Sequence, residues 1–262
     1  MDFLTEAQWA QYERDGFLKL GRVLSPDELQ ALQNRIDDIM LGRADLDYGR
    51  ILMQLDSSDG KYENAGEQSR GHKGATLNYR KIQDLEHDAL FFDFMRKPIF
   101  RLICERVYGP HTPIAAFRAM FMNKPANAGT LLPWHQDRWS NLDRDPLITL
   151  WTALDPATIE NGCVEVIAGS HKWGLLNPDH GSGFVTPEQG EAAMAQNPTQ
   201  WLEMAAGESV LMHNWLLHRS DKNHSAQSRR AFSVCYMDAE TVASNGEEFS
   251  EIFAPATLPA AI

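Results

Sequence analysis

The first hundred residues place their apolar side chains at helical spacing, with one short strand between two helices. Residues 5–16 open with a capping box and are predicted to form a short helix, and residues 17–20 a strand. Residues 25–41 begin with Ser-Pro-Asp-Glu, which is typical of a helix start, and their leucines and isoleucines recur on one face. A pair of helices is predicted over 87–95 and 98–108, before a Gly-Pro pair.

Beyond residue 110 the pattern changes to short segments rich in β-branched and aromatic residues. Strands are predicted at 113–125, 147–154, 162–167, 201–204, 208–218 and 229–237. Because helices come first and strands follow without regular alternation, a parallel βαβ sheet is disfavoured. The expected fold is mainly β within an α+β chain: an antiparallel jelly-roll barrel with the N-terminal helices packed on one face.

Two segments lack a clear period and are expected to form loops. Residues 56–75 are polar with several glycines, and such a segment often covers a site as a mobile lid. Residues 175–200 are predicted to be an insertion between strands, with a short helix at 187–194.

The length of the chain suits one domain with a substantial core. Of its 262 residues, 43% are hydrophobic, which is ordinary for a globular protein. Within a single domain, 1–262, we expect a largely helical part (1–110), a jelly-roll core (111–240) and a C-terminal tail (241–262).

The net charge and the cysteines limit which binding partners and which cellular compartment are expected. The net charge of −12 disfavours a nucleic-acid partner, because phosphate binding requires clustered lysine and arginine. The sequence has neither a basic start followed by an apolar core nor an apolar stretch of about 18 residues. A signal peptide and a membrane span are therefore not expected. Cys104, Cys163 and Cys235 stand apart in apolar surroundings, which favours reduced thiols and a cytoplasmic protein.

The pair His135 and Asp137, followed far along the chain by His218 and Arg229, is the strongest chemical signal. With 9 histidines and 36 acidic residues in 262, about one His-x-acid pair is expected by chance, and one is found. The context adds weight, because the pair follows an apolar run, His218 closes a predicted strand and Arg229 opens the next. Residues two apart on a strand face the same way, so an imidazole and a carboxylate can bind one metal ion together with a second imidazole.

Two histidines and one carboxylate on one side of Fe(II) leave three coordination positions, enough for a bidentate 2-oxo acid and dioxygen. Arg229 suits the distal carboxylate of 2-oxoglutarate, because a guanidinium is permanently charged and binds a carboxylate bidentately. Ser220, two residues beyond His218, could add a hydroxyl donor. The residues therefore indicate an oxygenase that uses Fe(II), 2-oxoglutarate as cosubstrate, and O2.

Each of these residues also has an ordinary structural explanation. A lone histidine inside a barrel is more often a hydrogen-bonded core residue than a ligand, and an arginine near a strand start is usually solvated. His213 competes with His218 as the second imidazole, because both lie in one apolar run; His218 is preferred because it closes the strand. A non-catalytic barrel that binds iron or a 2-oxo acid, such as a sensor, and a zinc hydrolase with the same ligands stay open as alternatives.

Motifs in three parts of the chain resemble the phytanoyl-CoA dioxygenase family of Fe(II)/2-oxoglutarate-dependent oxygenases. These motifs are Trp134-His135-Gln136-Asp137, Asn161-Gly162-Cys163 leading to Gly169-Ser170-His171, and His218-Arg219-Ser220 followed by Arg229-Arg230-Ala231. The resemblance covers most of the chain and implies a double-stranded β-helix, or cupin-like, barrel. Where the family commonly has Pro-Gly-Ser-His, this chain has Ala168 in place of the proline, and His171 is expected to be structural.

Carried over to this sequence, the resemblance implies roles for particular residues. The implied iron ligands and catalytic residues are His135, Asp137 and His218. The implied 2-oxoglutarate contacts are Arg229, Ser220, Lys81, Gln136, Trp151 and Met120. Strict alternation would turn Gln136 away from its two neighbours, so the strand is expected to end or twist there.

The implied reaction is hydroxylation, with decarboxylation of 2-oxoglutarate to succinate and CO2. Related halogenases lack the carboxylate that Asp137 supplies, so halogenation is not expected. An aromatic pocket beside basic groups would suit a small polar metabolite, and the candidate substrate residues are Arg118, Trp139, His213 and Trp215. Action on an acyl-CoA, or desaturation, is the alternative within the family. A small-molecule substrate is the partner predicted, with no nucleic acid or membrane, and no oligomeric state is predicted.

Overall fold

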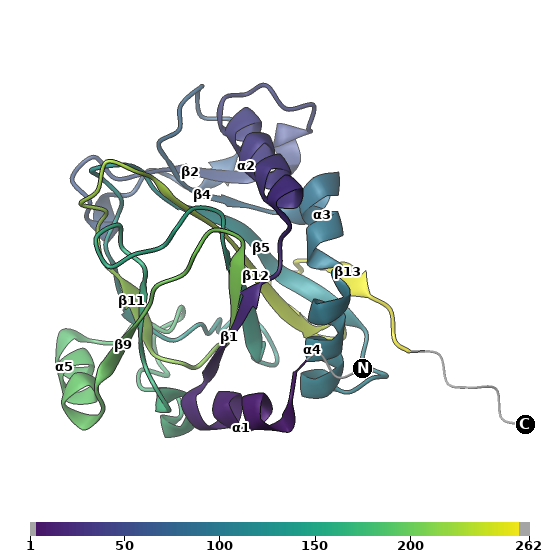
Figure 1. Ribbon diagram of the computed structural model, residues 1–262, viewed down its shortest axis with the longest axis vertical. Coiled ribbons are helices and arrows are strands. Elements are labelled where there is room, and N and C mark those ends of the chain that lie inside the picture. Colours follow the sequence, from purple (N-terminus) through teal and green to yellow (C-terminus); the bar gives the residue numbers. More distant parts are fainter. Residues whose placement is uncertain (1–3, 257–262) are drawn as a thin grey trace, which may run out of the picture.

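Strand-forming segments assemble into two antiparallel sheets in the computed structural model, which describes residues 4–256 (Figure 1). The larger sheet has the order β1 (Phe17–Arg22), β10 (Glu208–His213), β7 (Ile148–Ala153), β12 (Arg229–Asp238), β5 (Ile114–Lys124), β4 (Tyr79–Gln83), β2 (Leu52–Leu55), β3 (Ser69–Arg70). A further strand, β13 (Ser250–Phe253), also pairs with β5. The longest strands therefore lie near the middle of this sheet.

The smaller sheet has the order β6 (Leu132–His135), β11 (His218–Ser220), β8 (Val164–Ile167), β9 (Thr199–Leu202). Its strands are only three or four residues long. In the centre of this sheet His218 lies directly opposite His135 on one side and Val166 on the other. Residues distant in sequence are thus brought together by one short antiparallel pairing.

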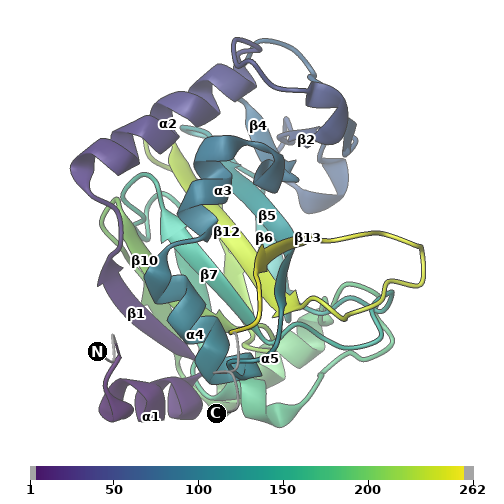
Figure 2. The same ribbon diagram turned by 90° about the vertical axis from the view of Figure 1, so that its right-hand side faces the viewer.

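The helices begin and end where local sequence signals place them. They are α1 (Glu6–Asp15), α2 (Pro26–Met40), α3 (Ala89–Met95), α4 (Pro98–Tyr108) and α5 (Pro187–Gln196). Short 3-10 turns are η1 (Tyr48–Arg50), η2 (Tyr62–Asn64), η3 (Leu85–His87) and η4 (Ser170–Trp173). Capping boxes open α1, α2 and α5. Figure 2 shows α2, α3 and α4 lying across one face of the larger sheet.

Alternation along the central strands separates two cores. On β12, Phe232, Val234 and Tyr236 pack beneath the helices with α2, α3 and α4 residues. The intervening residues face the smaller sheet, where Trp151 of β7 packs with Val164 and Val166 of β8. One face of the larger sheet is therefore committed to helix packing. The other face is free to line the space between the two sheets.

The predicted helices and most of the predicted strands are confirmed, with boundaries within two or three residues. One prediction was wrong: residues 208–218 do not form a single strand. They form β10 in the larger sheet and β11 in the smaller one, because the chain turns at residues 214–217 and crosses between the sheets. The pattern analysis also gave no strand at β2 or β4, which flank the polar segment 56–75.

Other expectations concern the cysteines and membrane spans. Cys104, Cys163 and Cys235 are free and buried, as expected of reduced core thiols. Among residues 4–256, no helix combines the length and the apolar character that crossing a bilayer requires. The C-terminal tail expected at 241–262 contains β13, and its last six residues lie outside the described part.

The start of α3 generates a stability prediction. Buried Asp88 accepts from the backbone N–H of Leu90 at 3.1 Å and from Arg35 Nε at 2.7 Å. Replacement Asp88→Ala removes a helix cap and the carboxylate partner of Arg35, so the free energy of unfolding should fall by about 2–4 kcal/mol. Urea denaturation measures this change. Asp93→Ala, exposed on the same helix, is the matched control and should change it by less than about 0.5 kcal/mol; equal effects would contradict this role for Asp88.

Candidate active site

A cavity of about 310 Å³ lies between the two sheets and is lined by residues of both. The larger sheet contributes Met120 of β5 and Trp151 of β7, and the smaller sheet contributes His135 and His218. This volume is at the lower end of the range of small-molecule sites. The cavity is therefore suited to small ligands.

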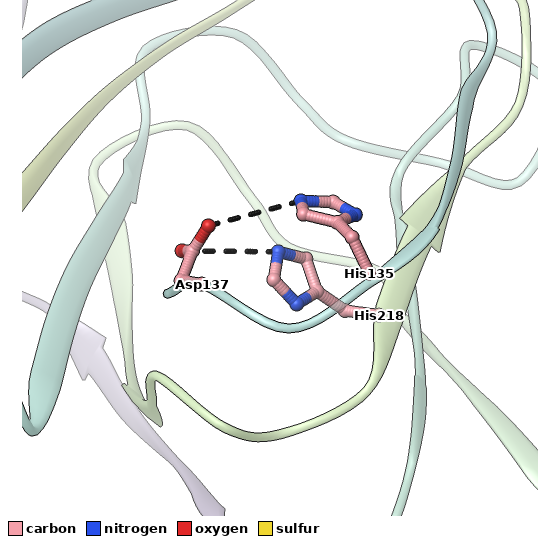
Figure 3. Close-up of side chains that lie close together, drawn as sticks. All are labelled: His135, Asp137 and His218. Atoms are coloured by element: carbon pink, nitrogen blue, oxygen red, sulfur yellow. Dashed lines mark ion pairs between the residues drawn. The ribbon is translucent and has the colours of Figure 1, made fainter. Parts of the chain in front are cut away.

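His135, Asp137 and His218 converge at this cavity (Figure 3). Asp137 Oδ1 lies 3.8 Å from His135 Nε2, and Asp137 Oδ2 lies 4.0 Å from His218 Nε2. One nitrogen or oxygen from each of the three lies within 4.8 Å of the others, the only such group of three or more histidine, cysteine, aspartate or glutamate residues in the described part of the chain. The three groups can therefore share one metal ion.

Local backbone structure sets the three positions. His135 is the last residue of β6 and His218 the first of β11, and the two face each other across the strand pair. The strand ends before Asp137, whose backbone N–H donates to Asn214 O at 2.7 Å. The strand ends at His135, and His135 and Asp137 still face the same side while Gln136 points away from them.

Hydrogen bonds orient both imidazoles. His135 Nδ1 lies 2.9 Å from Pro133 O, and His218 Nδ1 lies 2.9 Å from Leu216 O. Because a carbonyl oxygen can only accept, each Nδ1 carries the proton and each Nε2 is left as a lone pair. Both lone pairs belong to the nitrogens nearest Asp137, as a metal site requires.

The donor set fits a divalent metal ion. Burial raises the pKa of Asp137 and lowers that of His135, because each charged form loses its hydration. A bound cation would stabilise the carboxylate and the neutral imidazoles at once. Two imidazoles and one carboxylate are the donors of non-haem Fe(II) sites with open positions, and they also suit zinc.

Arg229 is a buried guanidinium without a charged partner. Its residue is 2% exposed, and it lies at the start of β12. Within the described residues Nη2 donates to Gly162 O at 3.1 Å, while Nε and Nη1 have no hydrogen-bond partner. The next residue, Arg230, instead binds Asp155 with two nitrogens at 2.8 Å. Leaving buried donors unpaired is costly, so the unpartnered N–H groups of Arg229 point to an anionic ligand.

The other predicted cosubstrate residues divide into two groups. Lys81, Met120, Trp151 and buried Ser220 line the cavity with Arg229. Burial and the nearby guanidinium groups of Arg118 and Arg80 lower the pKa of Lys81 to about 7.

Gln136 lies outside the cavity lining. Its Nε2 donates to Gly174 O at 2.8 Å and to Trp215 O at 2.9 Å, and its Oε1 accepts from Leu176 N–H at 2.8 Å. These bonds tie the residue to neighbouring loops and use its amide fully. Its turn away from the site follows from alternation after His135.

The candidate substrate residues also divide. Arg118 and Trp139 line the cavity, whereas His213 and Trp215 do not. Met212 faces the cavity, so alternation on β10 turns His213 to the opposite side, where its ring lies 5.0 Å from that of His171. The preference for His218 over His213 as the second imidazole agrees with the geometry, but the reason given for it, a single strand ending at His218, was wrong.

The pattern analysis missed several lining residues. Tyr62 and Gln68 come from the polar segment before β4, Arg80 comes from β4 itself, and Phe184 comes from the insertion before α5. The ring of Phe184 stacks on His135 at a centroid distance of 5.2 Å. Loops have no hydrophobic periodicity, so the sequence gives no signal for such contacts. Of these four residues, only Arg80 is adjacent in sequence to a predicted site residue, Lys81.

Comparisons with known proteins agree with this geometry. The model of the phytanoyl-CoA dioxygenase (PhyH) family matches residues 12–231. The phytanoyl-CoA dioxygenase of Arabidopsis thaliana is 26% identical over 256 residues, covering 90% of this chain and 90% of the relative. The human peroxisomal phytanoyl-CoA dioxygenase is 26% identical over 246 residues, covering 90% of this chain and 69% of the relative.

Solved structures show the same architecture. EctD from S. alaskensis, solved with 2-oxoglutarate and 5-hydroxyectoine, has a TM-score of 0.71 at 18% identity and covers 90% of this chain and 77% of that chain. The non-haem α-ketoglutarate-dependent carbocyclase SnoK has a TM-score of 0.68 at 18% identity, covering 93% of this chain and 87% of that chain. The expected jelly-roll, double-stranded β-helix fold is confirmed.

The geometry predicts different effects for two histidines five residues apart. His218→Ala should lower Fe(II) affinity at least about 100-fold, because one of three ligands is lost, whereas His213→Ala should retain Fe(II). The measurement is metal content by mass spectrometry after anaerobic loading with Fe(II) and desalting. Loss of iron in the His213 variant and retention in the His218 variant would exchange their roles.

Proposed function

The chain belongs to the phytanoyl-CoA dioxygenase family of Fe(II)- and 2-oxoglutarate-dependent oxygenases, and we propose that it hydroxylates a small polar metabolite. The observation that carries the proposal is the meeting of two features in one cavity. A group of two imidazoles and a carboxylate lies there with a buried guanidinium that lacks a counter-charge. A 2-oxoglutarate-dependent oxygenase needs the metal ligands and a cationic partner for the distal carboxylate of its cosubstrate.

In the proposed site His135, Asp137 and His218 hold the metal through their Nε2 and carboxylate oxygen atoms. Bound Fe(II) supplies the oxidative chemistry, in which O2 and 2-oxoglutarate yield succinate, CO2 and an oxidised C–H bond. The intact Asp137 carboxylate fills the position that a halide would need, which favours hydroxylation over halogenation. The hydrogen bonds to Pro133 O and Leu216 O keep both rings aimed at the metal.

Residues of both sheets bind the cosubstrate in this proposal. Arg229 offers N–H groups that lack a protein partner to the distal carboxylate of 2-oxoglutarate, and the Ser220 hydroxyl adds a donor. Trp151, whose ring centroid lies 5.5 Å from Arg229 Cζ, fixes the plane of the guanidinium. Lys81 contributes a charge whose presence depends on pH near neutrality.

The size and lining of the cavity support a small polar substrate. About 310 Å³ must accommodate both 2-oxoglutarate and the substrate, and five of the lining residues are arginine or lysine. A long acyl chain would leave these charges without partners. The cavity therefore gives less support to an acyl-CoA substrate and to desaturation. A sensor without turnover is also less supported, because it would not need a dioxygen position beside the metal.

Anaerobic addition of Fe(II) and 2-oxoglutarate tests the proposal. We expect a weak visible charge-transfer band at one equivalent of each, and succinate after admission of O2. Arg229→Gln should raise the Kd of 2-oxoglutarate about 100-fold while Fe(II) still binds, because only the distal carboxylate loses its partner. Arg144→Gln, an exposed residue outside the cavity, is the control. A wild type without the band and without succinate would reject the oxygenase.

The pKa of Lys81 generates a prediction about pH. A lysine with a pKa of about 7 is charged below pH 7 and neutral above it, and a bound carboxylate favours the charged form. The Kd of 2-oxoglutarate should therefore rise between pH 7 and 9, by up to about tenfold per unit. Titrations of wild type and Lys81→Met over this range measure the effect. The same slope in both proteins would show that another group is responsible.

A further inference from the structure

Arg118 is a second guanidinium in the cavity, and the proposed use of 2-oxoglutarate leaves it without a role. It extends from β5, and its Nε is buried without a hydrogen-bond partner among the described residues. Its Nη1 donates to Gln83 Oε1 at 3.0 Å, and Gln83 is itself buried at the end of β4. One bond to a neutral amide leaves most of the guanidinium donors free.

Aromatic rings hold the Arg118 guanidinium in place. Its Cζ lies 4.9 Å from the ring centroid of Phe117 and 5.0 Å from that of Trp139. The two rings pack against each other, with centroids 4.6 Å apart. Such contacts immobilise the cation, so a ligand binding to its donor edge meets a preorganised group.

No carboxylate in the described part of the chain lies within ion-pairing distance of Arg118. Burial lowers its pKa, and Asp137, Glu247 and Asp84 act on it only through longer-range charge. Arg219, which also lines the cavity, is different because it pairs with Glu165. Arg118 thus has the same unsatisfied state as Arg229, and the same physical reasoning points to an anion.

Strand register places the backbones of Arg118 and Arg229 far apart along the cavity-facing side of the larger sheet. On the paired strands Arg229 lies opposite Lys124, and Arg118 lies opposite Cys235, six residues along β5 from Lys124. At the rise of a strand this separates the two backbone positions by about 20 Å. Met120 and Met122 lie between them on the same face and line the cavity.

The charge of the cavity leaves room for another anion. The lining cations are Arg80, Lys81, Arg118, Arg219 and Arg229, against the single acid Asp137. Fe(II) and the dianion of 2-oxoglutarate cancel each other. Glu165 compensates Arg219, so the uncompensated charge of Arg118 persists after the metal and the cosubstrate have bound.

We propose that Arg118, supported by Gln83, binds an anionic oxygen group of the substrate, a carboxylate or a phosphonate, within this cavity. The substrate is then a small acid, held by its charge with a C–H bond turned toward the metal ligands. The inference rests on the proposed function and specifies its substrate class.

Calorimetric binding tests this proposal without turnover. The protein is loaded with 2-oxoglutarate and Zn(II), which supports no oxidation, and titrated with propionate, 3-aminopropionate, butyrate and propylphosphonate. Propionamide and butyramide are the uncharged analogues. We expect at least one acid to bind, with any amide of the same carbon skeleton at least tenfold weaker. The carboxylate and phosphonate arms identify the preferred anion.

Variants assign the binding to Arg118. Arg118→Gln should raise the Kd of the preferred acid at least tenfold, and Arg118→Lys should raise it less. In both variants the Kd of 2-oxoglutarate should stay within about threefold of the wild-type value. Arg144→Gln is the exposed control. Thermal melting shows whether Arg118→Gln folds. If it does not fold, the proposal is tested with Arg118→Lys and with the comparison of acid and amide binding to the wild type.

Three results would overturn the anion site: no acid binds the loaded wild type, amides bind as well as acids, or the Arg118 variants bind the acid as the wild type does. The proposed function fails separately, through loss of the charge-transfer band and of succinate formation. If the charge-transfer band is intact but acids and amides bind equally well, the role of Arg118 is rejected and the proposed function is retained.

Discussion

The antiparallel register between β6 and β11 is the constraint on which the candidate site depends. It places His218 opposite His135 at the end of one short strand and the start of the other. Asp137, two residues beyond His135, faces the same two rings. A shift by one residue would turn His218 to the opposite face of the sheet and separate the three groups. The metal site is thus a property of two strand termini, held by the sheets around them.

The two faces of the larger sheet have different roles, one in helix packing and one in ligand binding. On β5, Phe121 packs beneath the helices, while Arg118 and Met120 line the cavity. The helices stabilise one face by apolar burial, which allows the other face to keep polar groups that cost stability. Arg229, Arg118 and Lys81 are all cations in a protein of net charge −12. Their burial in one cavity is explained by anionic ligands rather than by overall charge.

Much of the fold could be predicted from local signals. Ser25 and Pro26 start α2 where the capping pattern indicates, and the strand-rich part after residue 110 forms the jelly roll. The crossing between β10 and β11 was missed because His213 and Asn214 interrupt the apolar residues at only two positions, and the chain turns there. The sheet positions of the two strands are set by tertiary pairing with β7 and β6.

The candidate site, like the fold, could be predicted only in part. The pattern of His135, Asp137, His218 and Arg229 was informative because His135, His218 and Arg229 lie at strand ends and Asp137 follows β6 by two residues. His213 and Trp215 were less predictable, since their direction depends on where β10 ends. Gln136 illustrates a different difficulty: the family resemblance implied a 2-oxoglutarate contact, whereas its amide is bound by three backbone groups of neighbouring loops.

A crystal structure of the protein prepared anaerobically with Fe(II) and 2-oxoglutarate, with anomalous data at the iron edge, tests the central claim most directly. The account predicts a single iron peak between His135, Asp137 and His218, and a 2-oxoglutarate molecule whose distal carboxylate contacts Arg229. Iron located elsewhere, or a dicarboxylate bound away from Arg229, would contradict it.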